Sequence, residues 1–196
     1  MRPARLLVIG LSLALSAAAA DDGAAQAPQE PPAQAPVAER GGQQDFDFSF
    51  GTWRTEVRVR PPLSGSDWSE YVGTSLVRPI WDGRANLVEL DVAGLAGRIV
   101  GLSLRLYEPE NRRWSLHYAN SRTGELTPPV TGSFTNGVGE FTSTETLEGR
   151  EVLVKFVISP AAPGQWRYVQ SYSADGGKSW EPNWIATDTL LGRTAD

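Results

Sequence analysis

The sequence predicts an all-β protein whose strands form a single antiparallel up-and-down barrel of about 8–10 strands. After Gln44, short runs rich in Val, Leu, Thr, Trp and Tyr alternate with turns rich in Gly, Pro, Asn and Asp. Apolar residues recur at every second position, which is the period of a strand. Only the segment around Phe46 to Phe50 departs from this pattern, as a possible helical turn. Because closure removes the two exposed edges of a sheet, a barrel is favoured over the alternative, a two-sheet sandwich.

Ten segments are expected to be strands, and turn sequences such as "WDGR", "EPENRR", "TNGVG" and "ADGG" separate most of them. In chain order the expected strands are 52–59, 69–78, 86–92, 99–107, 113–119, 130–134, 139–146, 152–158, 166–173 and 184–190.

The segment 99–107 has two different faces. One face carries Val100, Leu102, Leu104 and Leu106, and the other carries Gly101, Ser103, Arg105 and Tyr107. We expect the leucine face to form the core, because a polar interior would need a partner for every buried charge. In the alternative, the arginine face points inward and the barrel holds a charged cavity.

The domain is expected to span 44–194, after two segments of different composition. Residues 1–20 resemble a secretory signal peptide, with two arginines, an apolar run and the small residues of "SAAAAD". Residues 21–43 are rich in Ala, Pro, Gln and Gly and predict a disordered leader. We therefore expect an exported protein, periplasmic or extracellular, from a bacterium.

Charge and cysteine content narrow the classes of partner. The chain has 18 basic and 23 acidic residues, a formal charge of −5, and no cysteine. An acidic balance argues against nucleic acid and anionic membranes as partners. No apolar run after the signal is long enough for a transmembrane helix, so no integral membrane span is expected.

The first strand opens with Gly51, Thr52 and Trp53, after the aromatic segment "FDFSF". This G-x-W resembles the N-terminal signature of the calycin superfamily, the lipocalin-like barrels. The resemblance implies that Trp53 closes one end of the barrel and that a basic residue near the last strand packs over it. Arg193 stands at a suitable place, and Arg167 is the alternative.

A second resemblance covers nearly the whole domain. The stretches "GLSLRLYEPENRRWSLHYANSRTG", "PPVTGSFTNGVGEF" and "YSADGGKSWEPNW" resemble an uncharacterised family of secreted bacterial proteins, a domain of unknown function. The resemblance implies a fold and export but no activity. The cysteine pair and the helix that follows the last strand in a typical lipocalin are absent from the sequence.

The stretch "SYSADGGKSW" resembles an Asp-box, a hairpin signature of sialidase propellers. A propeller repeats it in every blade, whereas this chain carries it once. We expect a local role instead: Asp175 accepts backbone donors, Gly177 supplies a positive φ, and Trp180 packs over the hairpin.

The sequence contains no strong catalytic or metal-binding signature. His117 is the only histidine, and without cysteine it cannot build an ordinary zinc site, so no metal and no cofactor are expected. Glu89 and Asp91 share one strand face, as either a solvated surface or a polar cavity lining. An envelope enzyme acting on a lipid, terpenoid or glycan would use Glu89 or Asp91 as acid or base, assisted by His117.

The favoured function is the binding of a small, partly apolar molecule in the barrel or at its mouth. A third hypothesis, an interaction module of the cell envelope, rests on the seven tryptophans, which could form an exposed platform. The candidate ligand-binding residues are polar or aromatic at mid-strand positions: Glu89, Arg105, Tyr107, His117, Tyr118 and Trp184.

Overall fold

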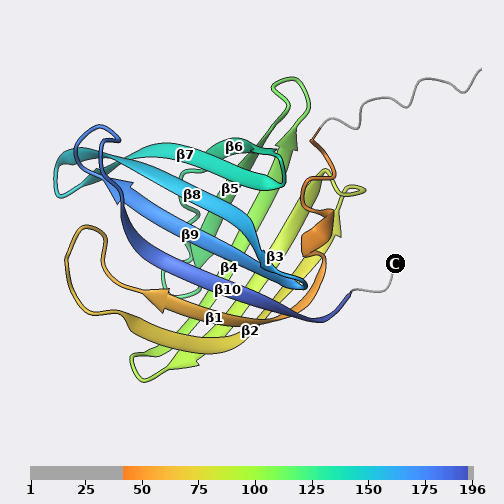
Figure 1. Cartoon of the computed structure of the whole chain (residues 1–196), viewed down its shortest axis with the longest axis horizontal. Helices are drawn as coiled ribbons and strands as arrows, with labels where there is room; N and C mark the ends of the chain where they lie inside the picture. Colours follow the sequence, from red (N-terminus) through yellow and green to blue (C-terminus); the bar gives the residue numbers. More distant parts are fainter. Residues whose placement is uncertain (1–41, 194–196) are drawn as a thin grey trace, which may run out of the picture. The chain divides into compact units, whose positions relative to one another are not determined.

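The computed structural model describes residues 42–193, and these form one closed barrel of ten antiparallel strands (Figure 1). The strands are β1 (Gly51–Val59), β2 (Ser69–Ile80), β3 (Ala85–Gly94), β4 (Gly97–Glu108), β5 (Arg113–Asn120), β6 (Val130–Thr135), β7 (Val138–Leu147), β8 (Arg150–Ala162), β9 (Gln165–Ser173) and β10 (Glu181–Gly192). Each strand pairs with its neighbours in sequence, and β1 pairs with β10 to close the ring. The predicted up-and-down barrel is therefore confirmed, and all ten expected segments lie in strands.

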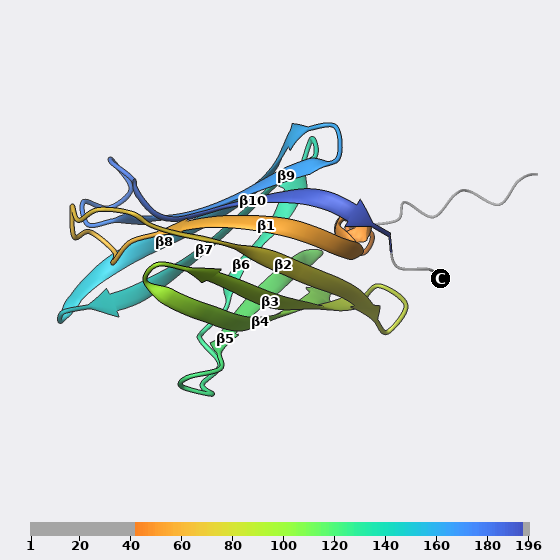
Figure 2. The ribbon, with the colours of Figure 1, turned by 90° about the horizontal axis from the view of Figure 1, so that it is seen from below.

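The one helical element of residues 42–193 is a 3-10 turn, η1 (Asp47–Ser49), which lies at the start of β1 (Figures 1 and 2). The loop between β1 and β2 and the β7–β8 and β9–β10 hairpins lie at the opposite end of the barrel. The two ends are thus built differently. We call the end at η1, with Phe46, Trp53, Trp114 and Phe141, the plugged end.

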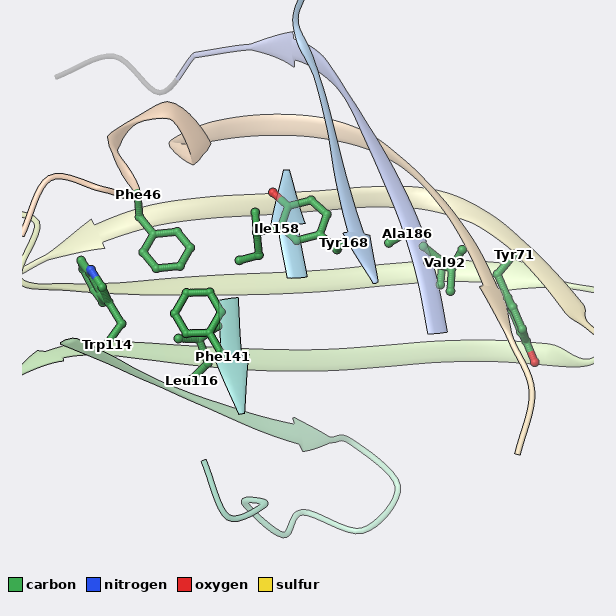
Figure 3. Packing of buried hydrophobic residues seen from close by; sticks show 10 residues of the cluster. Phe46, Tyr71, Val92, Trp114, Leu116, Phe141, Ile158, Tyr168 and Ala186 are labelled. Atoms are coloured by element: carbon green, nitrogen blue, oxygen red, sulfur yellow. The ribbon is translucent and has the colours of Figure 1, made fainter. Parts of the chain in front are cut away.

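Phe46 fills the plugged end. Its side chain is fully buried and points from the segment before β1 toward Trp114 and Phe141 (Figure 3). Its ring meets Trp114 edge-on at 4.8 Å and Phe134 edge-on at 5.0 Å between centroids. The Trp114 indole also donates a hydrogen bond to the carbonyl of Gly42 at 2.9 Å. Aromatic packing and this hydrogen bond hold the entering chain across the end of the barrel.

Trp53 lies at the same end, 1% exposed, beside Val77 and Val88. Its indole donates to the carbonyl of Ser49 at 2.8 Å. The Arg193 guanidinium lies 5.7 Å from the ring centroid and donates to the carbonyls of Phe48 and Phe50. The basic residue over the tryptophan is therefore Arg193, while Arg167 is exposed on β9.

The expectation for the two faces of β4 was wrong. Arg105 is buried and Gly101 and Ser103 point inward with it, whereas Val100 and Leu102 are 37% and 36% exposed on the outer face. The leucines lie in register with Leu87 of β3 and Ala119 of β5, so neighbouring strands cover them partly. The barrel tolerates the inward arginine because its interior is polar at this level, as described below.

The pairing between neighbouring strands is shortest between β5 and β6. Only three residue pairs join these strands, Trp114 with Gly132, Ser115 with Thr131 and Leu116 with Val130. Beyond Leu116, β5 contacts the loop of residues 121–129, which projects from the barrel (Figure 2). There the amide of Thr127 donates to the carbonyl of Tyr118 at 2.7 Å. A loop, and not a strand, thus completes this part of the wall.

The Asp-box-like hairpin joins β9 to β10. The Asp175 carboxylate accepts hydrogen bonds from the Ser173 hydroxyl and from the amide and hydroxyl of Ser179. These donors lower the pKa of Asp175 to about 2. Gly177 has a φ of 88°, and the Trp180 indole donates to its carbonyl at 3.1 Å. The motif acts locally, as a brace for one turn.

The proposed signal peptide and residues 21–41 of the proposed leader lie outside the described residues. Within residues 42–193, no helix is long and apolar enough to cross a membrane.

Candidate functional site

The half of the barrel away from the plugged end, which we call the hollow half, contains a cavity of about 320 Å³. Its walls combine aliphatic and aromatic side chains with a few polar groups. The apolar lining consists mainly of Val77, Val88, Leu90, Leu116, Val130, Phe156 and Ala186. Pockets that bind small molecules share this size and composition, so the cavity is the candidate site.

A polar cluster forms the deep part of the cavity, next to the plugged end. The Thr55 hydroxyl donates to the Asp188 carboxylate at 2.6 Å and lies 2.7 Å from the Ser75 hydroxyl. Because Thr55 has one proton to donate, Ser75 must donate to Thr55. β1 places Thr55 between Ser75 on β2 and Asp188 on β10, and Asp188 is directly opposite Thr55 in register.

Burial governs the ionisation of this cluster. Desolvation raises the pKa of Asp188 to about 6, although the Thr55 hydrogen bond and the positive charge of Arg105 oppose the shift. The same burial lowers the pKa of Arg105 and raises the pKa of Tyr168, whose hydroxyl interacts with both Arg105 and Asp188. Near neutral pH the cluster contains one guanidinium and one carboxylate linked through a tyrosine.

Arg105 is held by packing more than by charge. It is 6% exposed, and its guanidinium lies 4.4 Å from the centroid of the Phe46 ring. Arg105 forms no ion pair within 4.0 Å with a described residue. Its Nη1 also has no hydrogen-bond partner among the described residues. The neighbouring Asn86 lies directly opposite Arg105 in register and is fully buried. Neither its amide nitrogen nor its amide oxygen has a hydrogen-bond partner among residues 42–193. This region therefore contains buried donors and an acceptor that could still form hydrogen bonds.

The end of the cavity away from the plug is bordered by a second polar group. The Tyr172 hydroxyl donates to the Glu145 carboxylate at 3.1 Å, and the Gln170 amide donates to Tyr172 and to Asn183, each at 3.3 Å. Burial and the nearby Glu145 raise the pKa of Tyr172. The cavity is thus polar at both ends and apolar between them.

The cavity brings together four of the six ligand-binding candidates: Arg105, His117, Tyr118 and Trp184. Tyr118 packs where Gly101, on the neighbouring strand, leaves room, since a Cβ at Gly101 would lie 2.6 Å from the Tyr118 hydroxyl. His117 borders the cavity, but its register with Leu104 directs its side chain to the outer face.

The structure places Glu89 and Tyr107 away from the cavity. Glu89 lies on the outer face of β3 and is paired with Arg78 at 2.5 Å, and Asp91 is paired there with Arg98. Tyr107 points inward at the plugged end, where its ring lies 5.3 Å from that of Trp114. β3 and β4 thus place the carboxylates of Glu89 and Asp91 on the opposite side of the wall from Arg105.

Two further hypotheses lose their structural basis. Catalysis by His117 with Glu89 or Asp91 requires these groups in one pocket, but each carboxylate is paired with an arginine, and neither lines the cavity that His117 borders. Among the tryptophans of residues 42–193, Trp81 alone is largely exposed, at 65%, so no exposed row is present. Within the described residues, no group of three or more His, Cys, Asp or Glu could hold a metal ion.

The prediction missed the residues that build the deep cluster: Thr55, Ser75, Tyr168 and Asp188. One signal was present for Asp188. In "WIATDTLL" it shares a strand face with Trp184 and Ala186, so one inward face would carry a tryptophan, an alanine and a carboxylate. The opposite face, with Ile185, is also partly apolar, and the sequence could not tell which face was inside.

Comparison with known proteins gives similarity of fold only. No family model matches the chain, and the curated proteins contain no significant match. Among solved structures, the S-type phycobiliprotein lyase CPES from Guillardia theta is similar, with a TM-score of 0.54 and 12% identity over 80% of this chain and 96% of the lyase. A de novo designed fluorescence-activating β-barrel also aligns, at a TM-score of 0.41 and 12% identity over 74% of this chain and 95% of its own. The similarity to the lyase shows the barrel fold alone.

Proposed function

We propose that this protein binds a small, partly apolar molecule inside the hollow half of the barrel. The observation that carries the proposal is the cavity of about 320 Å³, apolar in the middle and polar at both ends. An elongated molecule with polar groups at its ends would match this order of surfaces. Its apolar body would bury area against Leu90, Leu116 and Phe156.

The barrel fold supports the proposal, because a closed barrel of this kind can enclose one small ligand. The similar lyase is named for phycobiliproteins. At 12% identity, that name does not transfer to this chain. The lining of this cavity therefore has to identify its ligand.

Native mass spectrometry of the protein purified from its own source tests the proposal. We expect a retained mass in addition to that of the chain, lost when Ala186→Phe fills the cavity. Ala186 is 6% exposed and lines the cavity, so a phenyl ring there would occupy the ligand's space. The matched control is Ala93→Phe, an exposed position on the outer face of β3.

Overpacking can itself cost about 1–3 kcal/mol, so thermal unfolding must show that Ala186→Phe remains folded. A ligand that stays bound in folded Ala186→Phe would lie outside the cavity and would contradict the proposal.

We also propose that the protein is exported, on the basis of the signal-like residues 1–20. Cleavage after Ala20 would leave Asp21 as the first residue of the mature chain. The intact mass of the protein from its own source measures this directly, and a mass that includes residues 1–20 would contradict it.

A further inference from the structure

We infer that the ligand carries a carboxylate and that Arg105, in the deep part of the cavity, binds it. The inference rests on the proposed function and specifies the chemical class of the ligand. It follows from the one buried guanidinium that lines the cavity.

A buried positive charge is costly unless an anion compensates it. The carboxylate of Asp188 lies in the same cluster, but it accepts its hydrogen bond from Thr55 and forms no ion pair with Arg105 within 4.0 Å. Arg105 also keeps an unused donor, Nη1. Compensation of Arg105 within the described residues is therefore incomplete, and a ligand anion would complete it.

The charge of the cluster favours a carboxylate over a phosphate. A guanidinium and a carboxylate match in planar geometry and can form two parallel hydrogen bonds. A phosphate monoester carries a second negative charge near neutral pH. Asp188 would repel that second charge at close range in a poorly solvated site.

The volume of the cavity guides the choice of a probe. At about 320 Å³ it lies at the small end of the range for pockets that bind small molecules. Octanoate is a small molecule that combines one carboxylate with an apolar body. It serves as a probe of the chemistry and is not put forward as the natural ligand.

The test is calorimetric titration of the full mature protein with octanoate, octanol and octylamine. All three probes contain eight carbon atoms and differ in the charge of the head group. We expect octanoate to bind about 10- to 100-fold more tightly than octanol, since a hydrogen bond to a charged group is worth this much. Octylamine should bind most weakly, because Arg105 would repel it.

Two substitutions should move octanoate affinity in opposite directions. Arg105→Met keeps a long side chain and removes the charge, so octanoate should bind no more tightly than octanol. Asp188→Asn removes the repelling carboxylate and should tighten octanoate about 3- to 10-fold. The control is Arg54→Met, an exposed arginine of β1.

The outcomes separate the two proposals. Equal binding of octanoate and octanol, abolished by Ala186→Phe, would overturn the carboxylate inference and leave the cavity as a ligand site. Binding of no probe, or binding unaffected by Ala186→Phe, would count against the proposed function itself. Because the three probes are compared on the unmodified protein, the test does not depend on the stability of Arg105→Met.

Discussion

The plugged end and the hollow half are parts of the same ring of strands, yet their inward positions are filled differently. At the plugged end, inward positions carry Trp53, Trp114 and Phe141, and the chain before β1 adds Phe46. In the hollow half, the corresponding positions of β4 and β10 carry Ser103 and Ala186. Side-chain volume at every second position therefore decides where a barrel is solid and where it holds a cavity.

The boundary between the two regions is also where charge is buried. Arg105 lies against the Phe46 ring on one side and lines the cavity on the other. Aromatic packing thus fixes the position of a group that faces the cavity. This arrangement matches the general rule that a functional side chain needs rigid support.

The strongest way to test the difference is to remove one phenylalanine from each region. Phe46→Ala should lower the free energy of unfolding by about 3–5 kcal/mol, because it leaves a void among packed aromatic rings. Phe156→Ala should cost clearly less, since Phe156 already faces the cavity. Urea unfolding of both variants measures the difference. Equal losses would show that the hollow half is packed as tightly as the plugged end.

The second test concerns the buried carboxylate at the boundary. Folding raises the pKa of Asp188 from 3.8 to about 6, so the folded state favours the neutral acid. The stability that Asp188 contributes is present below about pH 4 and is lost as the pH rises through about 6.

Between pH 4 and pH 8 the free energy of unfolding of the unmodified protein should therefore fall by about 2–3 kcal/mol relative to that of Asp188→Asn. Unfolding by urea at both values, with Asp91→Asn on the outer face as the control, gives this difference. The same pH dependence in both proteins would mean that Asp188 is not the titrating group.

A smaller effect is expected at the rim of the plugged end. Arg193→Met should lower the free energy of unfolding by about 1 kcal/mol, because it removes the cation–π contact with Trp53 and the bonds to Phe48 and Phe50. Thermal unfolding measures the loss, and Arg167→Met, an exposed arginine on β9, is the control. A loss as large for Arg167→Met would remove the special role of Arg193.

The smallest effect on stability is expected beside the short pairing of β5 with β6. The amide of Tyr118 donates to the Thr127 hydroxyl at 3.2 Å, and Thr127→Val removes this acceptor. Hydrogen exchange of the Tyr118 amide should become faster, while the global free energy of unfolding changes by less than about 1 kcal/mol. An unchanged exchange rate would show that the loop of residues 121–129 does not protect β5.

The strands and their order were predictable from the sequence because turn residues and period-two alternation are local signals. The inward face of β4 was not, since both of its faces look plausible in isolation. Leu102 and Leu104 lie outside because Arg105 finds Phe46, Tyr168 and Asp188 inside, and these three residues come from three other parts of the chain. Such a compensation is visible only once the strands are in register.

The same reason explains why only some residues of the candidate site were predicted correctly. Tyr118 and Trp184 were predicted as cavity residues because each is aromatic at a mid-strand position, and both line the cavity. Glu89 satisfied a similar rule, but the period of two placed it on the other side of the wall with Arg78. A shift of one residue exchanges inside for outside, and single-strand patterns do not fix it.

The pairing of β1 with β10 means that the ring has no intrinsic first strand. Gly51 and Gly192 lie beside each other, and Arg193 donates to the carbonyl of Phe48, so a linker from Arg193 back to Gly42 would join the two ends of the described chain and keep Phe46 in the sequence. New ends could then be opened at residues 121–124, before the bridge between Leu126 and Ala119, so that the pairings of all ten strands stay intact. A circularly permuted chain of this kind would keep every rung of the barrel and place its termini beside the cavity.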